Sequence, residues 1–268
     1  MGSYVLREYA LKNGSIVNNP IMPKLFNLGT NKQGLIVYGG ESSADYGMVI
    51  SEAPAFERPA RKQTVYTVPG RNGSVIFQQD AWEDVVRSYT VFMTKEGKLD
   101  LTEIVDAFEG WLNSQKGYQR LEDSFEPDVF RLAYYSGGDS VSNNLTQYGE
   151  ATINFVCRPE RFYKSGELEV TVTNGTKMTN STRFASKPLI HIEGSGVVTV
   201  SIGGKTIQAT ITDYINIDCD TMNAYRTAAE NMNDKIEGNF PVIPSGINTV
   251  LITGTTTLVT IVPRFFTI

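Results

Sequence analysis

Residues 68–74 read Val68-Pro69-Gly70-Arg71-Asn72-Gly73-Ser74. Proline holds its φ at about −65°, glycine takes positive φ without steric cost, and an Asn-Gly pair is a strong hairpin signal. Short runs of alternating apolar residues flank this stretch, at 64–68 and 75–77. The pattern therefore predicts a tight turn between two antiparallel strands, with Arg71 exposed on the turn.

Similar alternating runs at 48–50 and 88–93 extend the β pattern on both sides of this turn. One segment departs from it, because its apolar residues recur at helical spacing and share one face. They are Leu101, Ile104, Val105, Phe108 and Leu112. Lys116-Gly117 then supplies a stop signal. We predict a helix over about residues 101–115 that packs against the sheet.

The composition changes after residues 158–163, which read Arg158-Pro159-Glu160-Arg161-Phe162-Tyr163. Beyond them the chain is rich in Thr, Val, Ile and Gly, with turn signals about every 8 to 12 residues, as in a β-sandwich or barrel. The sequence predicts a mainly β protein of two domains. Residues 1–42 are an arm or loose strands of the first domain, 43–163 are its remainder, and 164–268 are a β-sandwich. The ambiguous segment 221–233 is predicted to be non-helical.

Composition excludes several classes of protein. The 268 residues carry a formal net charge of −5, and the longest basic run is only residues 58–62, which argues against a nucleic-acid surface. No apolar run approaches the length of a membrane span, and the first residues lack a signal-peptide pattern, so folding in a cytoplasm is expected. Cys157 and Cys219 have no CxxC partner and are expected to be reduced, buried thiols.

The sequence offers no catalytic, metal or cofactor site. His191 is the only histidine, which excludes a multi-histidine metal site, and its alternation with Ile190 and Ile192 predicts an outward-facing strand residue. No phosphate-binding glycine motif is present.

Paired carboxylates could serve a glycosidase, and acidic residues gather in two segments. They are Glu122, Asp123, Glu126 and Asp128 in one, and Asp213, Asp218 and Asp220 in the other. Nothing in the sequence suggests that one carboxyl is desolvated beside an ionised one, so both segments are expected to be solvated loops. We predict that the protein is not an enzyme.

Several short motifs occur in a characteristic order. In the first half they are Ser43-Ala44-Asp45-Tyr46-Gly47, the turn at 68–73, the helix at 101–115 and Cys157-Arg158-Pro159. In the second half they are Lys187-Pro188-Leu189-Ile190, Gly194-Ser195-Gly196, Ile217-Asp218, Tyr225, Gly238-Asn239-Phe240-Pro241, Pro244-Ser245-Gly246-Ile247-Asn248 and Pro263-Arg264-Phe265-Phe266. Over roughly residues 43–268, this order resembles the distal tail protein family of long, non-contractile-tailed phages.

The resemblance implies a structural protein of the virion tail tip that is assembled in the host cytoplasm. It implies a hexameric ring built by the N-terminal domains, with galectin-like C-terminal sandwiches projecting outward. The implied partners are the tail tube protein, the tail-tip or tail-associated lysin protein, the tape-measure protein and, in many phages, receptor-binding proteins. No cofactor and no membrane insertion are implied.

In this setting the turn residues Pro69, Gly70, Arg71, Asn72 and Gly73 belong to the ring-forming domain. Arg71 is a candidate ring contact, because its planar fork can bind a neighbour's carboxylate with two hydrogen bonds. The alternative is a carbohydrate-binding adhesion module that recognises host cell-wall polysaccharide through the C-terminal sandwich.

Overall fold

The computed structural model describes residues 34–94, 101–137, 141–144, 148–227 and 229–268. The described residues fall into two compact units, one reaching to Arg161 and including Ile268, the other covering residues 162–267. Strands make up most of the regular structure of both units, so the prediction of a mainly β protein is confirmed. The domain boundary between 163 and 164 and the galectin-like fold stay predictions.

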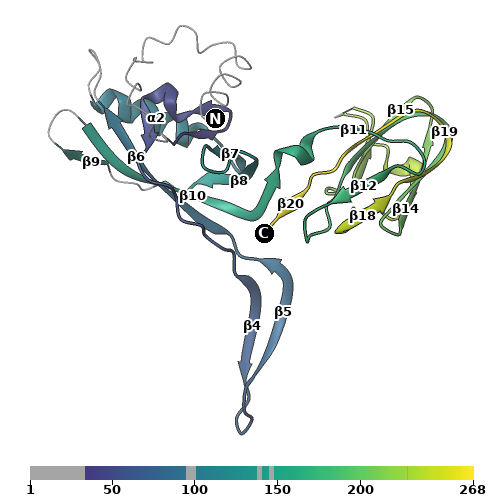
Figure 1. Ribbon diagram of the computed structural model, residues 1–268, viewed down its shortest axis with the longest axis horizontal. Coiled ribbons are helices and arrows are strands. Elements are labelled where there is room, and N and C mark those ends of the chain that lie inside the picture. The colour runs from purple at the N-terminus through teal and green to yellow at the C-terminus, as the bar shows by residue number, and fades with distance from the viewer. Residues whose placement is uncertain (1–33, 95–100, 138–140, 145–147, 228) are drawn as a thin grey trace. The chain divides into compact units, whose positions relative to one another are not determined.

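The first unit is built on a sheet with the strand order β2-β1-β7-β8-β10-β6-β3, and β9 is added to β10 (Figure 1). Its strands are β1 (Ile36–Tyr38), β2 (Glu41–Ser42), β3 (Met48–Ile50), β6 (Val85–Thr94), β7 (Gln119–Asp123), β8 (Val129–Tyr135), β9 (Val141–Asn144) and β10 (Tyr148–Tyr163). A 3₁₀ helix, Ser43–Tyr46, lies between β2 and β3. The longest pairing, β6 with β10, is antiparallel and runs from Val85 opposite Cys157 to Thr94 opposite Tyr148.

The predicted helix is present as α2 (Leu101–Ser114). Ile104, Phe108 and Leu112 of its apolar stripe are buried in the core of the first unit, and Val105 packs against this core, as the periodicity indicates. Trp111 lies at the centre of this contact, because its ring stacks on Tyr46 and its Nε1 donates a hydrogen bond to the Tyr38 carbonyl at 3.1 Å. Gly117 beyond the helix end has a φ of 68°, which fits its role as a stop residue.

Residues 34–42 belong to the segment for which an arm or loose strands were predicted. Within it, β1 is buried in the sheet, with Ile36 and Tyr38 almost fully inaccessible. Tyr38 packs against Phe155 at 4.9 Å between ring centroids. The described part of this segment therefore contributes one core strand, β1, and a short edge strand, β2, while residues 1–33 lie outside the described residues.

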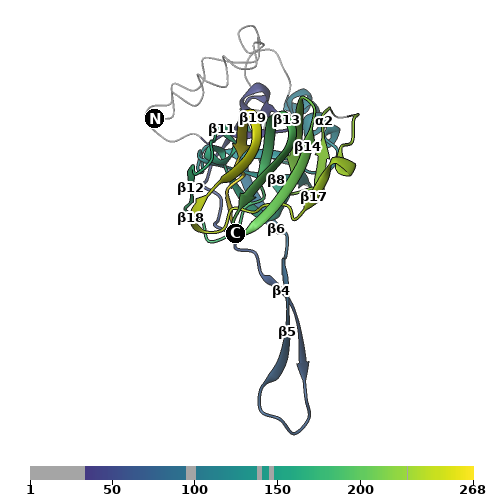
Figure 2. The same cartoon turned by 90° about the vertical axis from the view of Figure 1, so that its right-hand side faces the viewer.

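The second unit contains a sheet with the order β11-β19-β13-β14-β17, and Figure 2 shows these strands side by side. Strand β15 pairs with β13 and β16, and β12 pairs with β18. The strands are β11 (Val170–Thr171), β12 (Lys177–Asn180), β13 (Leu189–Ile202), β14 (Lys205–Ile211), β15 (Tyr214–Asp218), β16 (Asn223–Tyr225), β17 (Ile236–Gly238), β18 (Gly246–Thr249), β19 (Leu251–Val262) and β20 (Phe266–Thr267).

Apolar residues alternate with polar ones along several of these strands, and the buried apolar side chains form an aliphatic core. On β13 the side chains of Val198, Val200 and Ile202 are buried on one face. A two-residue hairpin turn, Gly203 and Gly204, joins β13 to β14. Both residues have positive φ values, 60° and 76°, which glycine adopts without steric cost.

Three local predictions in this unit and at its border are confirmed. His191 is partly exposed on β13 between the buried Ile190 and Ile192, and its Nδ1 lies 2.8 Å from Asn216 Oδ1. Both cysteines are free and buried, and burial raises the pKa of Cys157 to about 11 and that of Cys219 to about 12. No α-helix occurs in the described part of residues 221–233.

The aromatic core makes a stability prediction. Phe155→Ala removes a fully buried ring that contacts Tyr38, Tyr89 and Tyr135, so we expect the free energy of unfolding to fall by about 3–5 kcal/mol. Denaturant unfolding followed by tryptophan fluorescence measures this change. The matched control is Phe56→Ala, whose ring is 73% exposed and whose loss should leave stability unchanged. Equal effects of the two substitutions would contradict the core assignment.

Candidate functional site

Strands β4 (Arg61–Thr67) and β5 (Ser74–Trp82) form a two-stranded antiparallel sheet of their own, which we call the arm. The arm extends away from the sheet of the first unit (Figures 1 and 2). Every residue of β4 is exposed, and β5 is exposed along most of its length. Residues 68–74 thus lie at the end of a projection rather than in the body of the unit.

The turn at the tip is wider than an Asn-Gly hairpin. The strands end at Thr67 and Ser74, which are paired, and a six-residue loop joins them. Within the loop the Arg71 N–H donates to the Val68 carbonyl at 3.2 Å, and Gly70 has a φ of 77°. This is the geometry of a type II turn with proline at its second position and glycine at its third. Residues 68–73 thus form a loop with a β-turn at its start, between the two strands on either side.

The arm carries apolar side chains on both of its faces. Val65 and Ile76 are directly opposite each other and share one face. Tyr66 and Phe77 share the other face, with their ring centroids 5.7 Å apart in an edge-to-face contact. These four side chains are between 51% and 59% exposed.

Such a surface is unusual for a two-stranded hairpin in water. An isolated hairpin is marginally stable, and contiguous exposed apolar side chains on a soluble protein mark an interaction site. Because both faces of the arm are apolar, a partner that covered only one of them would leave the other in solvent. The arm is the candidate functional site of the described residues.

The base of the arm is held by directed contacts. The Arg61 guanidinium lies 4.7 Å from the centroid of the Trp82 ring, and the Glu83 N–H donates to the Ala60 carbonyl at 2.8 Å. The chain then enters β6, where Arg87 turns inward and donates from Nη1 to the Ala55 carbonyl at 3.4 Å. Arg87, the third residue of β6, therefore contacts the segment that leads into the arm.

Arg87 belongs to a buried set of charges, which we call the base cluster. It consists of Arg87, Asp123, Glu126, Arg131 and Arg161. Arg87 Nη2 donates to Asp123 Oδ2 at 2.8 Å and lies 3.2 Å from Glu126 Oε2. Arg161 Nη1 donates to Glu126 Oε1 at 2.7 Å, and Arg131 also donates to Glu126.

Further hydrogen bonds complete the environment of Asp123. The Tyr89 hydroxyl donates to Asp123 Oδ2 at 2.8 Å, and the backbone N–H groups of Phe125 and Glu126 each donate to Oδ1 at 2.9 Å. Both carboxylate oxygens are thus satisfied, which is what a buried charge requires.

The base cluster holds its carboxylates in the ionised form. Burial by itself would raise the pKa of Asp123, but Arg87 and the Tyr89 hydroxyl outweigh burial and hold this pKa below its ordinary value. Burial likewise opposes ionisation of Glu126, and Arg131, Arg87 and Arg161 together lower its pKa. Neither group is a carboxylic acid kept protonated for proton transfer.

This corrects the prediction of a solvated acidic loop. Glu122 and Asp123 are each only 6% exposed and form the end of strand β7, and Glu122 pairs with Arg120. The second acidic segment is also partly structural, because Asp218 accepts hydrogen bonds from Arg264 at 2.7 and 3.1 Å. Spacing along the chain could not show the arginines that each carboxylate meets.

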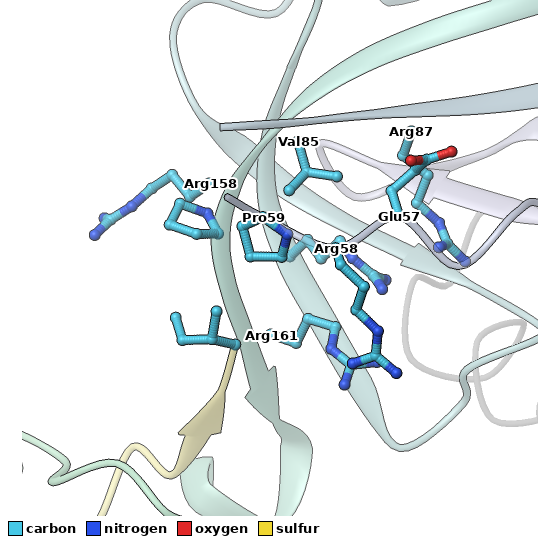
Figure 3. A pocket seen from close by; sticks show the side chains of 10 residues that line it. Glu57, Arg58, Pro59, Val85, Arg87, Arg158 and Arg161 are labelled. Carbon is cyan, nitrogen blue, oxygen red and sulfur yellow. The ribbon is translucent and has the colours of Figure 1, made fainter. Parts of the chain in front are cut away.

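A small pocket opens beside the base cluster (Figure 3). The lead-in to the arm contributes Glu57, Arg58 and Pro59 to it, and β6, β8 and β10 contribute arginines. These are Arg87, Arg131, Arg158 and Arg161. Most of this positive charge is already paired with Asp123, Glu126 and Glu160. The pocket is therefore part of the support of the arm rather than a strongly cationic site.

Within the described residues, no group of three or more His, Cys, Asp or Glu side chains is placed to hold a metal ion. None of the helices that the structure describes is long and apolar enough to cross a membrane.

Comparison with known proteins gives a fold relationship. No protein-family model matches the sequence, and no curated protein matches it either. Among solved structures, the chain is similar to the Dit (gp 19.1) protein of phage SPP1, a distal tail protein described as a paradigm of the hub adsorption apparatus in phages that infect Gram-positive bacteria. The two share a TM-score of 0.70 at 17% sequence identity, over 88% of this chain and 100% of the other. The resemblance to distal tail proteins is thus confirmed in the fold.

The base cluster makes a prediction about stability and pH. Asp123→Asn removes the nearer of the two carboxylates that face the buried Arg87, so we expect the free energy of unfolding to fall by up to about 3–5 kcal/mol at neutral pH. Because the pKa values of Asp123 and Glu126 are lowered on folding, their contribution is complete above the unfolded pKa of about 4 and is lost as pH falls through the folded values.

Denaturant unfolding between pH 3 and pH 8 tests both statements. The wild-type protein should lose stability at the acid end, and Asp123→Asn should flatten that loss. Asp80→Asn is the control, since this carboxylate on the arm is fully exposed. A wild-type profile that does not fall in acid would contradict the role of the base cluster.

Proposed function

We propose that this chain is a structural component of a phage tail tip and that its arms join copies of it into a hexameric ring. The single observation that carries the proposal is the arm, with apolar side chains more than half exposed on both faces. The fold shared with a distal tail protein supports the same reading. No catalytic role is proposed.

A ring can close when each chain carries one projecting element that binds the next chain. When the arm of one copy packs on a different surface of the next, the contact is heterologous, and such contacts close into a ring if the rotation between copies allows it. Each copy then gives one arm and receives one. The number six comes from the family resemblance and is part of the proposal.

In the proposed assembly the ring joins the tail tube to the tail-tip or tail-associated lysin protein. The tape-measure protein and, in many phages, receptor-binding proteins are further proposed partners, and the ring would form in the host cytoplasm before it becomes part of the virion. Pro69, Gly70, Arg71, Asn72 and Gly73 would form the end of the seam between copies.

The carbohydrate-binding alternative lacks a supporting observation. Sugar sites use exposed aromatic rings as stacking surfaces. Among the described residues, the markedly exposed aromatic side chains are Phe56, Tyr66, Phe77, Tyr118 and Tyr134, and all of them belong to the first unit. The second unit, which the alternative requires, presents aliphatic residues such as Val197 and Ile247 instead.

Removing the aromatic pair of the arm should prevent assembly without harming the fold. We expect Tyr66→Ser with Phe77→Ser to lower the ring population by about tenfold or more, since each large side chain contributes about 1.5–3 kcal/mol when buried in a seam. Mass photometry should show wild-type particles near six times 29.6 kDa and monomers of the variant. The control is Gln63→Ser with Gln78→Ser on the same strands. A wild-type protein that stays monomeric, also with a tail partner present, would contradict the proposal.

Arg71 allows a narrower test of the tip. Arg71→Ala should weaken assembly more than folding, because within the described residues its side chain has no partner in its own chain. Arg71→Lys keeps the charge but loses the planar fork, so it should assemble better than alanine and worse than arginine. A lower melting temperature of the Arg71→Ala monomer together with intact rings would show that Arg71 contributes to folding rather than to assembly.

A further inference from the structure

Exposed large apolar side chains of the first unit gather in two places within its described residues. The arm and its lead-in hold one group, which is Phe56, Val65, Tyr66, Val68, Ile76 and Phe77. The other group lies on the body and consists of Val86, Tyr118 and Tyr134, which are 53%, 44% and 38% exposed. The second group has no role in the core or in the base cluster.

Tyr134 and Val86 of the second group lie on β8 and β6, the two strands that flank β10 in the sheet. The rings of Tyr118 and Tyr134 meet edge to face with centroids 5.4 Å apart, and the Tyr118 hydroxyl donates to Asp84 Oδ2 at 3.3 Å. Val86 lies two residues after Asp84 in the chain. It pairs directly with Val156 on β10, so the two valines share a face of the sheet. We call these five residues, Asp84, Val86, Tyr118, Tyr134 and Val156, the sheet patch.

The arm of the same copy is directed away from the sheet patch. Strand β5 ends at Trp82 and the chain enters β6 at Val85, so the patch lies at the base of the arm. The nine residues of β5 span about 30 Å, and Figures 1 and 2 show them running outward from β6. The aromatic face near the tip is therefore far from the patch of its own chain.

The charges favour a second copy as the occupant of the patch. Residues 61–82 contain Arg61, Lys62, Arg71 and one acidic residue, Asp80, so the arm carries a net charge of +2. The whole chain carries −5, which leaves −7 on the remainder. Two acidic residues, Glu83 and Asp84, lie at the edge of the patch. A cationic arm is thus attracted to the anionic body of another copy of the same protein.

We propose that the sheet patch receives the aromatic face of the arm, Tyr66 and Phe77, from a second copy of this chain. This inference rests on the proposed ring and names the surface that the arm covers. Tyr118 and Tyr134 meet Tyr66 and Phe77 in an aromatic cluster, with Asp84 at its rim. Each copy gives one arm and fills one patch, so a closed ring leaves neither the aromatic face of an arm nor a sheet patch exposed.

Cysteine cross-linking tests the contact in the full chain. Thr64→Cys lies opposite Phe77 on the aromatic face of the arm, and Ser88→Cys lies two residues beyond Val86 on β6. Neither substitution removes an apolar residue of the proposed contact. When the two single variants are mixed and treated with a short bismaleimide, we expect a cross-linked dimer that neither variant forms alone. Cys157 and Cys219 are buried and should not react.

A matched pair of substitutions measures how much Val86 contributes to assembly. Val86→Asp should weaken assembly by about tenfold or more, as expected for a residue at the centre of an interface. Val197→Asp is the control, because Val197 is also 53% exposed on a strand but belongs to the second unit. Assembly should not change in this control.

The outcomes separate the two proposals. Rings that form without a cross-link between Thr64→Cys and Ser88→Cys, and that tolerate Val86→Asp, would overturn the sheet patch and leave the proposed ring intact. A wild-type chain that forms no ring under any condition would overturn both. A cross-link together with selective loss of assembly in Val86→Asp would support the patch as the receiving surface.

Discussion

The ion pair between Arg87 and Asp123 connects the parts of the first unit on which its projection depends. Arg87 is 3% exposed and Asp123 is 6% exposed, so each charge needs a buried partner of opposite sign, and they supply one to each other. Arg87 lies on β6, which continues the arm, and Asp123 ends β7, which pairs with the buried strand β1. The same guanidinium reaches the Ala55 carbonyl ahead of the arm. One buried charge pair thus ties both ends of the projection to the sheet.

This arrangement explains how an element without a core of its own keeps its direction. The arm buries little of its surface, and two-stranded hairpins alone are marginal in water. Its base is nevertheless fixed by the contact of Arg61 with Trp82, by the bond from Glu83 to Ala60 and by the charges beneath. An ordered base with an exposed apolar end is the arrangement expected of an element that gains its packing from another molecule, because less freedom is lost on association.

The candidate site was only partly predictable. Local rules located the turn, since Pro69 and Gly70 specify backbone angles that few other residues accept. They did not show that the strands on either side leave the body, because alternation of apolar residues reports the pleat of a strand and not what covers its faces. The alternating run at 64–68 looks the same as that at 88–93, yet the first is exposed and the second contains the buried Tyr89 and Val91. The prediction for the acidic segment was wrong for a related reason, because the side chains that bind Asp123, those of Arg87 and Tyr89, lie far earlier in the chain on β6.

By itself the sequence determined the local features of this protein. Helical spacing from Leu101 to Leu112, the glycine pair at 203 and 204 and the outward position of His191 each follow from residues close together in the chain. Only the tertiary structure decided which charges are buried, that β1 lies in the core, and that the hairpin at 61–82 stands outside it. Those outcomes depend on pairing between residues tens of positions apart, such as Arg87 with Asp123, and no local preference of the chain encodes them.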